Sequence, residues 1–302
     1  MGFTSCLSGI TPGADETGRG RVSHPGVAVP RVGPAGLATP TPPEHVLRCS
    51  GMKLGRRELI KVPEITAIFW IIKLLSTAMG ESTSDYLVKH MNPVVAVGIG
   101  GIFLVVALII QFRARTYVPW IYWLAVLMVA VTGTMAADVL HIQFKVPYAA
   151  STPFFAIVLA IVFIAWNRTE GTLSIHSIYT PRREAFYWAT VMATFAMGTA
   201  LGDLTAVTFH LGYLVSAVLF AGLMLIPAVG YRLFGMNEIL AFWFAYVLTR
   251  PLGASIADWL GKPHHVGGLA LGDGVVSFGF AVLIVICVGY LTVRQRDPAF
   301  TD

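Results

Sequence analysis

Four aspartates recur at matched positions in this 302-residue chain, and a histidine follows each within three to seven residues. The pairs are Asp85 with His90, Asp138 with His141, Asp203 with His210, and Asp258 with His264. A carboxylate together with an imidazole suits Mn, Zn, Ni or Co better than Mg or Ca. None of the pairs has the spacing of a known zinc box. The pattern predicts four cation-binding or proton-carrying aspartates with a candidate metal ligand beside each. The alternative is that the carboxylates are bonded to neighbouring helix ends and the histidines are only solvated.

The aspartates belong to a longer repeat, in which a Trp precedes a Gly by ten residues and the Asp by fifteen. The four copies are Trp70–Gly80–Asp85, Trp123–Gly133–Asp138, Trp188–Gly198–Asp203 and Trp243–Gly253–Asp258. The residue before each Asp is also small, which gives a small-xxx-small pattern that lets helices approach closely in lipid. The glycines therefore predict helix packing, which in the functional interpretation also brings the four acids together. The tryptophans are interpreted as interfacial anchors or bundle-core residues, or alternatively as the lining of a pathway.

The elements that must position these residues are membrane-spanning helices. The chain is 56% hydrophobic and 12% charged, which is outside the usual composition of soluble domains. Apolar runs near the ~20 residues that cross a bilayer cover residues 65–87, 93–112, 118–140, 152–167, 185–207, 211–231, 237–259 and 274–293. The sequence thus predicts an all-α, polytopic membrane protein of eight helices. On each odd-numbered helix the Trp and the Asp would lie within about 60° of one another and roughly 22 Å apart.

Basic residues are distributed unequally between the two sides of the membrane. One side carries twelve: Lys53, Arg56, Arg57, Lys61, Arg113, Arg115, Arg168, Arg182, Arg183, Arg232, Arg294 and Arg296. The other side carries Lys89, Lys145 and Lys262. The positive-inside rule then places both termini in the cytoplasm of a bacterial inner membrane and the four aspartates near the outer surface. The net charge of +5 is explained by the excess of basic residues on the cytoplasmic side of the membrane. We therefore do not expect nucleic acid as a partner.

The chain divides into an N-terminal tail and a membrane domain. Residues 1–51 are rich in Pro, Gly, Thr and Arg without an apolar period, which predicts a disordered tail or an over-extended start. The membrane domain, 52–302, is predicted to contain four two-helix repeats at about 62–115, 116–168, 182–234 and 235–294. Each half of the domain has four spans, so the repeats are parallel. We expect the first helix of each repeat to form a pseudo-fourfold inner ring, with the second helices around it.

Four tandem two-helix units, each with a Trp in its first helix, resemble a bacterial multi-pass membrane family catalogued only as a repeat of unknown function. The likeness covers roughly residues 60–293, and all four tryptophans are present. The resemblance implies the architecture and little about activity, because the family was defined without one.

Other charges lie within or near the predicted spans. Glu81 is predicted to be an auxiliary carboxylate. Together with the four aspartates it gives an excess of acidic residues over the two basic ones, Lys73 and Arg250. This negative excess favours a cation or bound protons over an anion. Alternatively, Lys73 and Arg250 pair with acids on other helices. Asp273 would either cap the last helix or add a fifth acid to the external cluster.

The function that these features favour is a secondary transporter or exporter of a small cation, with a divalent transition metal as the leading candidate and protons as the coupling ion. The rival interpretation is a membrane scaffold or sensor whose aspartates are structural. We find no phosphate loop, His-Glu-x-x-His or nucleophile elbow, so we do not expect an enzyme. No organic cofactor is expected, although a bound divalent metal ion is compatible with the pattern. The sequence does not indicate an oligomeric state.

Overall fold

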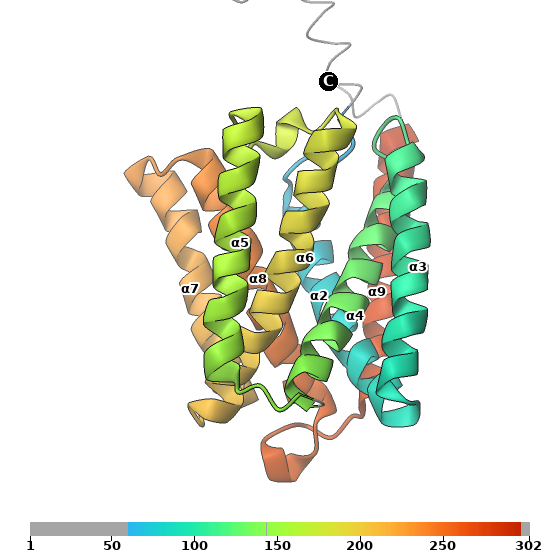
Figure 1. The fold of residues 1–302 in the computed structure, drawn as a ribbon, viewed down its shortest axis with the longest axis vertical. Coiled ribbons are helices and arrows are strands. Elements are labelled where there is room, and N and C mark those ends of the chain that lie inside the picture. The colour runs from blue at the N-terminus through green and yellow to red at the C-terminus, as the bar shows by residue number, and fades with distance from the viewer. Residues whose placement is uncertain (1–59, 143, 297–302) are drawn as a thin grey trace, which may run out of the picture. The chain divides into compact units, whose positions relative to one another are not determined.

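Eight α-helices of 21 to 24 residues stand side by side in the computed structural model (Figure 1), which describes residues 60–142 and 144–296. They are α2 (Ala67–His90), α3 (Pro93–Arg113), α4 (Pro119–Ile142), α5 (Tyr148–Glu170), α6 (Pro181–Asp203), α7 (Tyr213–Phe234), α8 (Glu238–Gly261) and α9 (Asp273–Arg296). Short helical turns lie at Ile175–Ser177, Leu204–Thr208 and His264–Val266. The all-α prediction with eight helices is confirmed. The predicted tail, residues 1–51, lies outside the described residues.

Seven of these helices are long and apolar enough to cross a membrane, and α2 is the exception. It has 24 residues, but it carries buried polar side chains such as Lys73, Thr77 and Glu81. These side chains face other helices rather than lipid, because α2 packs against α4, α8 and α9. The polarity of α2 is therefore accommodated within the protein.

The first helices of the repeats close into a ring, as predicted. Helix α2 packs on α4 and α8, and α6 packs on the same two helices from the other side. Each outer helix packs mainly on the inner helix of the following repeat, so that α3 covers α4, α5 covers α6, α7 covers α8, and α9 covers α2. The four repeats are thus interlocked around the ring.

The tryptophans form a closed aromatic layer at one level of the ring. Each contacts the aromatic residue that precedes the Trp of the previous repeat, with ring centroids 5.7–6.2 Å apart. The pairs are Phe69–Trp123, Tyr122–Trp188, Tyr187–Trp243 and Phe242–Trp70. Three of the four tryptophans are buried and Trp70 is half-buried. They are therefore residues of the bundle core.

The repeated glycines mark the closest approach of neighbouring inner helices. A β-carbon added at each glycine would contact a residue on the next inner helix of the ring, seven positions after the Trp of that helix. The pairs are Gly80 with Ala130, Gly133 with Phe195, Gly198 with Arg250, and Gly253 with Thr77. At Gly80 the added carbon would lie 2.5 Å from Ala130 Cβ and 3.0 Å from its carbonyl carbon, so the backbones would have to separate.

Replacing Gly80 with alanine is expected to destabilise the ring by about 1–3 kcal/mol, the usual cost of overpacking. The readout is the thermal unfolding midpoint of the purified protein in detergent. Gly98→Ala is the matched control, because nothing lies within 4 Å of an added β-carbon at that position in α3. Equal midpoints for the two variants would show that the repeated glycine is not a contact point.

Candidate functional site

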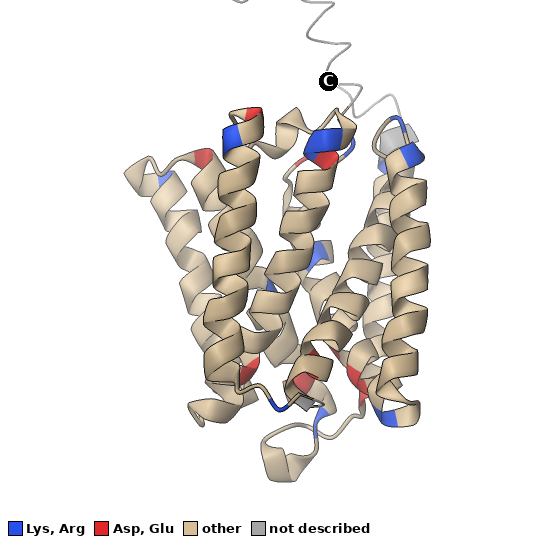
Figure 2. Cartoon of the chain, viewed as in Figure 1, with Lys and Arg blue, Asp and Glu red and all other residues tan. Residues whose placement is uncertain are grey.

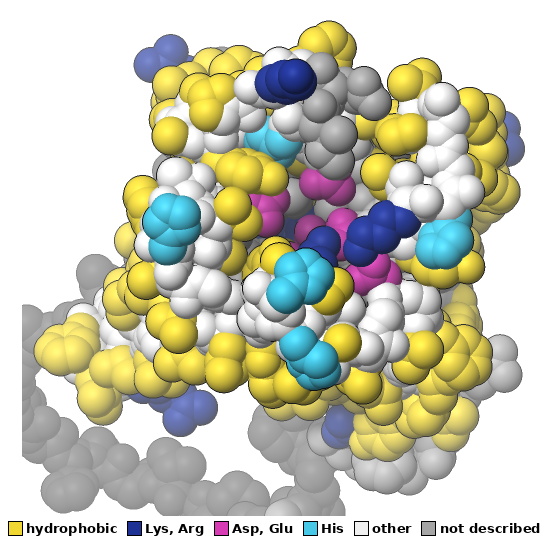
Figure 3. Space-filling model, turned by 90° about the horizontal axis from the view of Figure 1, so that it is seen from below, with side chains coloured by type: hydrophobic (Ala, Val, Ile, Leu, Met, Phe, Trp, Pro, Cys, Tyr) yellow, Lys and Arg dark blue, Asp and Glu magenta, His cyan; other side chains and the backbone are white. Residues whose placement is uncertain are grey.

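The four repeat aspartates lie at one end of the inner helices, and we call Asp85, Asp138, Asp203 and Asp258 the acidic ring. Acidic residues gather at this end of the bundle, whereas basic residues predominate at the other (Figure 2). Seen from this end, the acidic side chains line a central hollow with histidines around its margin (Figure 3). Asp258 is buried and the other three aspartates are half-buried. The repeat spacing thus brings the four carboxylates to one site.

One part of the acidic ring combines carboxylates with an imidazole. Donor atoms of Asp138, His141 and Asp203 all lie within 4.8 Å of one another. Ser84 Oγ donates a hydrogen bond to Asp138 Oδ2 at 3.1 Å. His141 reaches the aspartates because it lies three residues after Asp138, on the same face of α4. Asp203 is the last residue of α6 and is followed by a π-helical turn, Leu204–Thr208, a distortion that is frequent at functional sites.

The His141 ring is oriented by a serine on another helix. Its Nε2 lies 2.7 Å from Ser151 Oγ, while the serine hydroxyl points to the Tyr148 carbonyl at 3.4 Å. The serine oxygen therefore accepts a hydrogen bond from the Nε2–H group of His141, which leaves the ring's lone pair on Nδ1. Nδ1 is buried and has no hydrogen-bond partner in the described part of the chain. A hydrogen bond to the distal ring nitrogen is the usual arrangement of a metal-binding histidine.

Lysines neutralise the other part of the acidic ring. Lys262 pairs with Asp85, and its Nζ lies 3.5 Å from Asp258 Oδ1. Lys89 pairs with Asp273, and its Nζ lies 3.8 Å from Asp85 Oδ2. Burial lowers the pKa of Lys262, but Asp258 and Asp85 raise it by more, so the net shift is upward. The Lys262 ammonium therefore stays charged. Asp273, for which two roles were open, contributes its carboxylate to this external cluster.

The other predicted histidines are placed differently. His90 is exposed and stacks on Tyr86, with its Nδ1 2.7 Å from the Tyr86 carbonyl. His264 Nδ1 lies 3.0 Å from the carbonyl of Gly268 in its own loop, and His210 is exposed. Within the described residues, the structure thus groups only His141 with two of the aspartates.

A buried polar layer lies beneath the acidic ring, and we call it the arginine layer. The Arg250 guanidinium is fully buried, and its Nη2 lies 2.7 Å from Glu81 Oε2 and 2.7 Å from Thr199 Oγ1. The same nitrogen contacts Thr134 Oγ1. The alternative in which Arg250 pairs with an acid on another helix is confirmed. Glu81, Thr134 and Thr199 each follow a repeated glycine directly, so three equivalent positions converge on one arginine.

Lys73 lies nearer the aromatic layer and pairs with no acid in the described residues. Its buried Nζ lies 4.2 Å from the Phe195 ring centre and 4.3 Å from that of Tyr246. Arg250 Cζ lies 5.1 Å from the same Phe195 ring. Two basic side chains thus lie beside one phenylalanine ring, whose face attracts positive charge.

Sequence reasoning missed several of these residues for different reasons. The roles of Thr134 and Thr199 could have been found, because both follow the repeated glycine as Glu81 does. Ser84 was noted only as a small residue, although it is the one hydroxyl at its repeat position. Ser151 had no signal in the sequence, because it lies on the outer helix α5 and reaches His141 only after folding.

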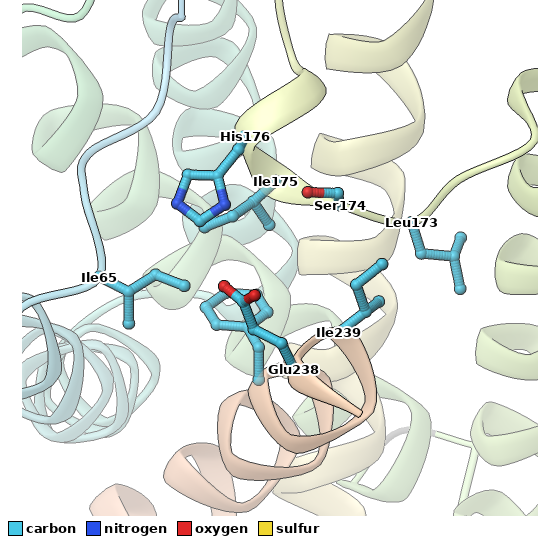
Figure 4. A pocket seen from close by; sticks show the side chains of 8 residues that line it. Ile65, Leu173, Ser174, Ile175, His176, Glu238 and Ile239 are labelled. Atoms are coloured by element: carbon cyan, nitrogen blue, oxygen red, sulfur yellow. The ribbon is translucent and has the colours of Figure 1, made fainter. Parts of the chain in front are cut away.

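A pocket lies near the starts of α2 and α8, at the end of the bundle opposite the acidic ring, and Figure 4 shows the side chains that line it. It is lined by Ile65, Leu173, Ser174, Ile175, His176, Glu238, Ile239 and Phe242. Its lining is mostly apolar, and Trp243 Nε1 beside it donates to the Leu173 carbonyl at 2.9 Å. The pocket contains none of the residues predicted to bind a cation.

Fold and site together define a class of protein: a multi-pass membrane protein built as a ring of four interlocked helix pairs with an acidic mouth. The chain belongs to the family described as Repeat of Unknown Function (DUF347), whose model matches residues 68–117, 121–172, 186–235 and 241–297. Each matched segment contains one copy of the repeat. No curated protein and no solved structure matches the chain.

Proposed function

We propose that the protein is a secondary transporter that binds a divalent transition-metal cation at the acidic ring. The observation that carries this proposal is the grouping of Asp138, His141 and Asp203, whose donor atoms lie within 4.8 Å of one another. Two carboxylates and an imidazole form a ligand set suited to Mn, Zn, Ni or Co. Bonds of ~2.0–2.2 Å to such an ion require only small side-chain movements from these positions. The contact with Ser151 supports the same assignment, because it leaves Nδ1 of His141 available.

The arginine layer determines what a transport cycle would require. Arg250 and Glu81 occupy the ring just inside the acidic mouth, and a cation entering there meets the positive guanidinium. Passage of a cation along the ring axis would therefore need Arg250 to move. The arrangement is that expected of a state that is open toward the acidic end and closed toward the basic end.

Orientation and coupling complete the proposal. The excess of basic residues at the opposite end favours both termini in the cytoplasm of a bacterial inner membrane, with the acidic mouth outside. Cation binding requires the Asp138 and Asp203 carboxyl groups to be deprotonated, so metal and protons would exchange at one site. Such exchange would use the proton gradient and needs no ATPase.

The alternative is a scaffold or sensor in which the aspartates close the bundle. The ion pairs of Lys262 with Asp85 and Asp258 favour this reading for half of the acidic ring. The half that contains Asp138 and Asp203 supports the metal site instead, because no lysine or arginine nitrogen of the described residues lies within 4.0 Å of either carboxylate.

Two histidines at the same end of the protein provide a matched test. We expect Co²⁺ to bind the purified full-length protein, as measured by calorimetric titration, and His141→Ala to weaken binding at least about 10-fold. His90→Ala is expected to leave the affinity unchanged, because the His90 ring contacts the Tyr86 carbonyl of its own helix. Ser151→Ala should give an intermediate loss, since it removes only the bond that orients His141.

The two histidine variants separate the competing readings. Equal affinities for His141→Ala and His90→Ala, or tight binding of Mg²⁺ in place of Co²⁺, would contradict a transition-metal site at Asp138, His141 and Asp203.

A further inference from the structure

The four repeats differ at the residue that lies four positions after each aspartate of the acidic ring. This residue is Lys89 in the first repeat, Ile142 in the second, Val207 in the third and Lys262 in the fourth. A residue four positions along a helix lies on the same face. The first and fourth repeats therefore supply an ammonium group near their own aspartate, whereas the second and third repeats have an uncharged residue at this position in the sequence.

Because of the order of the helices around the ring, the two lysines lie in the same half of the acidic ring. The first helices of the fourth and first repeats, α8 and α2, are neighbours, as are α4 and α6. Lys262 joins Asp258 to Asp85 across the α8–α2 boundary, and Lys89 lies on the same side. The lysine half of the ring is thus α8–α2, and the open half is α4–α6.

Charge and hydrogen bonding differ between the halves in the same way. In the lysine half, Asp85 and Asp258 share the Lys262 ammonium, whose side chain is only 20% exposed. In the open half, no lysine or arginine nitrogen of the described residues lies within 4.0 Å of the Asp138 or Asp203 carboxylate. The side chains that contact these two carboxylates there are His141 and Ser84. One divalent cation would balance the two carboxylates in their ionised form.

We propose that Lys262, assisted by Lys89, is a tethered cation that fills half of the acidic ring and so limits the ring to a single divalent ion in the open half. The inference rests on the proposed function, since it assumes that the open half binds a metal. It makes Lys262 the residue that sets the number of bound ions.

The protein itself supplies the substitutions that test this inference. Lys89→Ile and Lys262→Val copy the residues of the second and third repeats into the first and fourth. Equilibrium dialysis of the full-length protein against Co²⁺ is expected to give one bound ion for the wild type and two for this double variant. Val207→Lys does the reverse: it places an ammonium four residues after Asp203, at a position that is 46% exposed, and is expected to weaken Co²⁺ binding at least about 10-fold.

Each outcome bears on a different claim. Absence of Co²⁺ binding to the folded wild type would overturn the proposed function and this inference with it. One bound ion in the wild type and one in the folded double variant would overturn the inference alone. If the double variant does not fold, as judged by size-exclusion chromatography, Val207→Lys decides, and unchanged binding in that variant would overturn the inference.

Discussion

Replacing Glu81 with methionine is expected to destabilise the protein by about 3–5 kcal/mol, because it leaves the Arg250 charge buried without its acid. Arg250 is fully buried and Glu81 is 3% exposed, so water cannot compensate for the lost partner. The two threonine hydroxyls would remain near the guanidinium, but they carry no charge. The thermal unfolding midpoint of the purified protein in detergent measures the effect.

The double variant Glu81→Met, Arg250→Met is the control. Replacing a buried ion pair with apolar side chains is often neutral or stabilising, so the double variant should recover most of the midpoint lost by Glu81→Met. A double variant less stable than Glu81→Met would contradict this account, because its loss would come from packing rather than from an unpaired charge. If the arginine layer also closes the transport path, the double variant should leak cations across liposomes.

The double variant Asp138→Asn, Asp203→Asn is expected to abolish the effect of the protein on cellular metal. Asparagine keeps the size of aspartate but removes both charges from the open half, so binding should weaken by more than the 10- to 100-fold typical of changes outside the first ligands. Cells that express the wild type should differ from cells without it in Mn, Zn, Ni or Co content and in sensitivity to that metal. Cells that express the double variant should resemble cells without the protein.

The substitution Glu64→Gln provides the matched control, because it removes an exposed carboxylate that lies three residues before α2, at the opposite end of that helix from Asp85. It should behave like the wild type. Identical metal content and sensitivity in cells expressing the wild type and the aspartate double variant, at equal protein levels, would refute metal transport at this site.

Much of the architecture could be predicted because one spacing recurs four times. Equal spacing puts Trp, Gly and Asp at equal heights on four helices, so a closed ring satisfies all four copies together. The aromatic layer, the glycine contacts and the acidic ring are three levels of that symmetry. The packing of each outer helix on the following repeat was not predictable, since apolar lipid-facing helices such as α3 and α7 carry little positional information.

The candidate site was less predictable because its contacts break the symmetry. His141 joins the aspartates since it remains on the helix three residues after Asp138. His90, at five residues after Asp85, faces elsewhere, and His210 and His264 lie beyond their helices. Asp85, which pairs with Lys262, and Glu81, which pairs with Arg250, both lie on a neighbouring repeat, so no spacing within one repeat could identify these two pairs. Lys73 was expected to pair with an acid as one alternative, and instead it lies between aromatic rings.

Metal flux into proteoliposomes containing only this protein tests the central claim most directly. With an acidic lumen and Co²⁺ outside, the account predicts that Co²⁺ accumulates and the luminal pH rises, and that Asp138→Asn, Asp203→Asn abolishes both changes. Co²⁺ accumulation no greater than in protein-free liposomes, with the wild type folded and inserted, would contradict it.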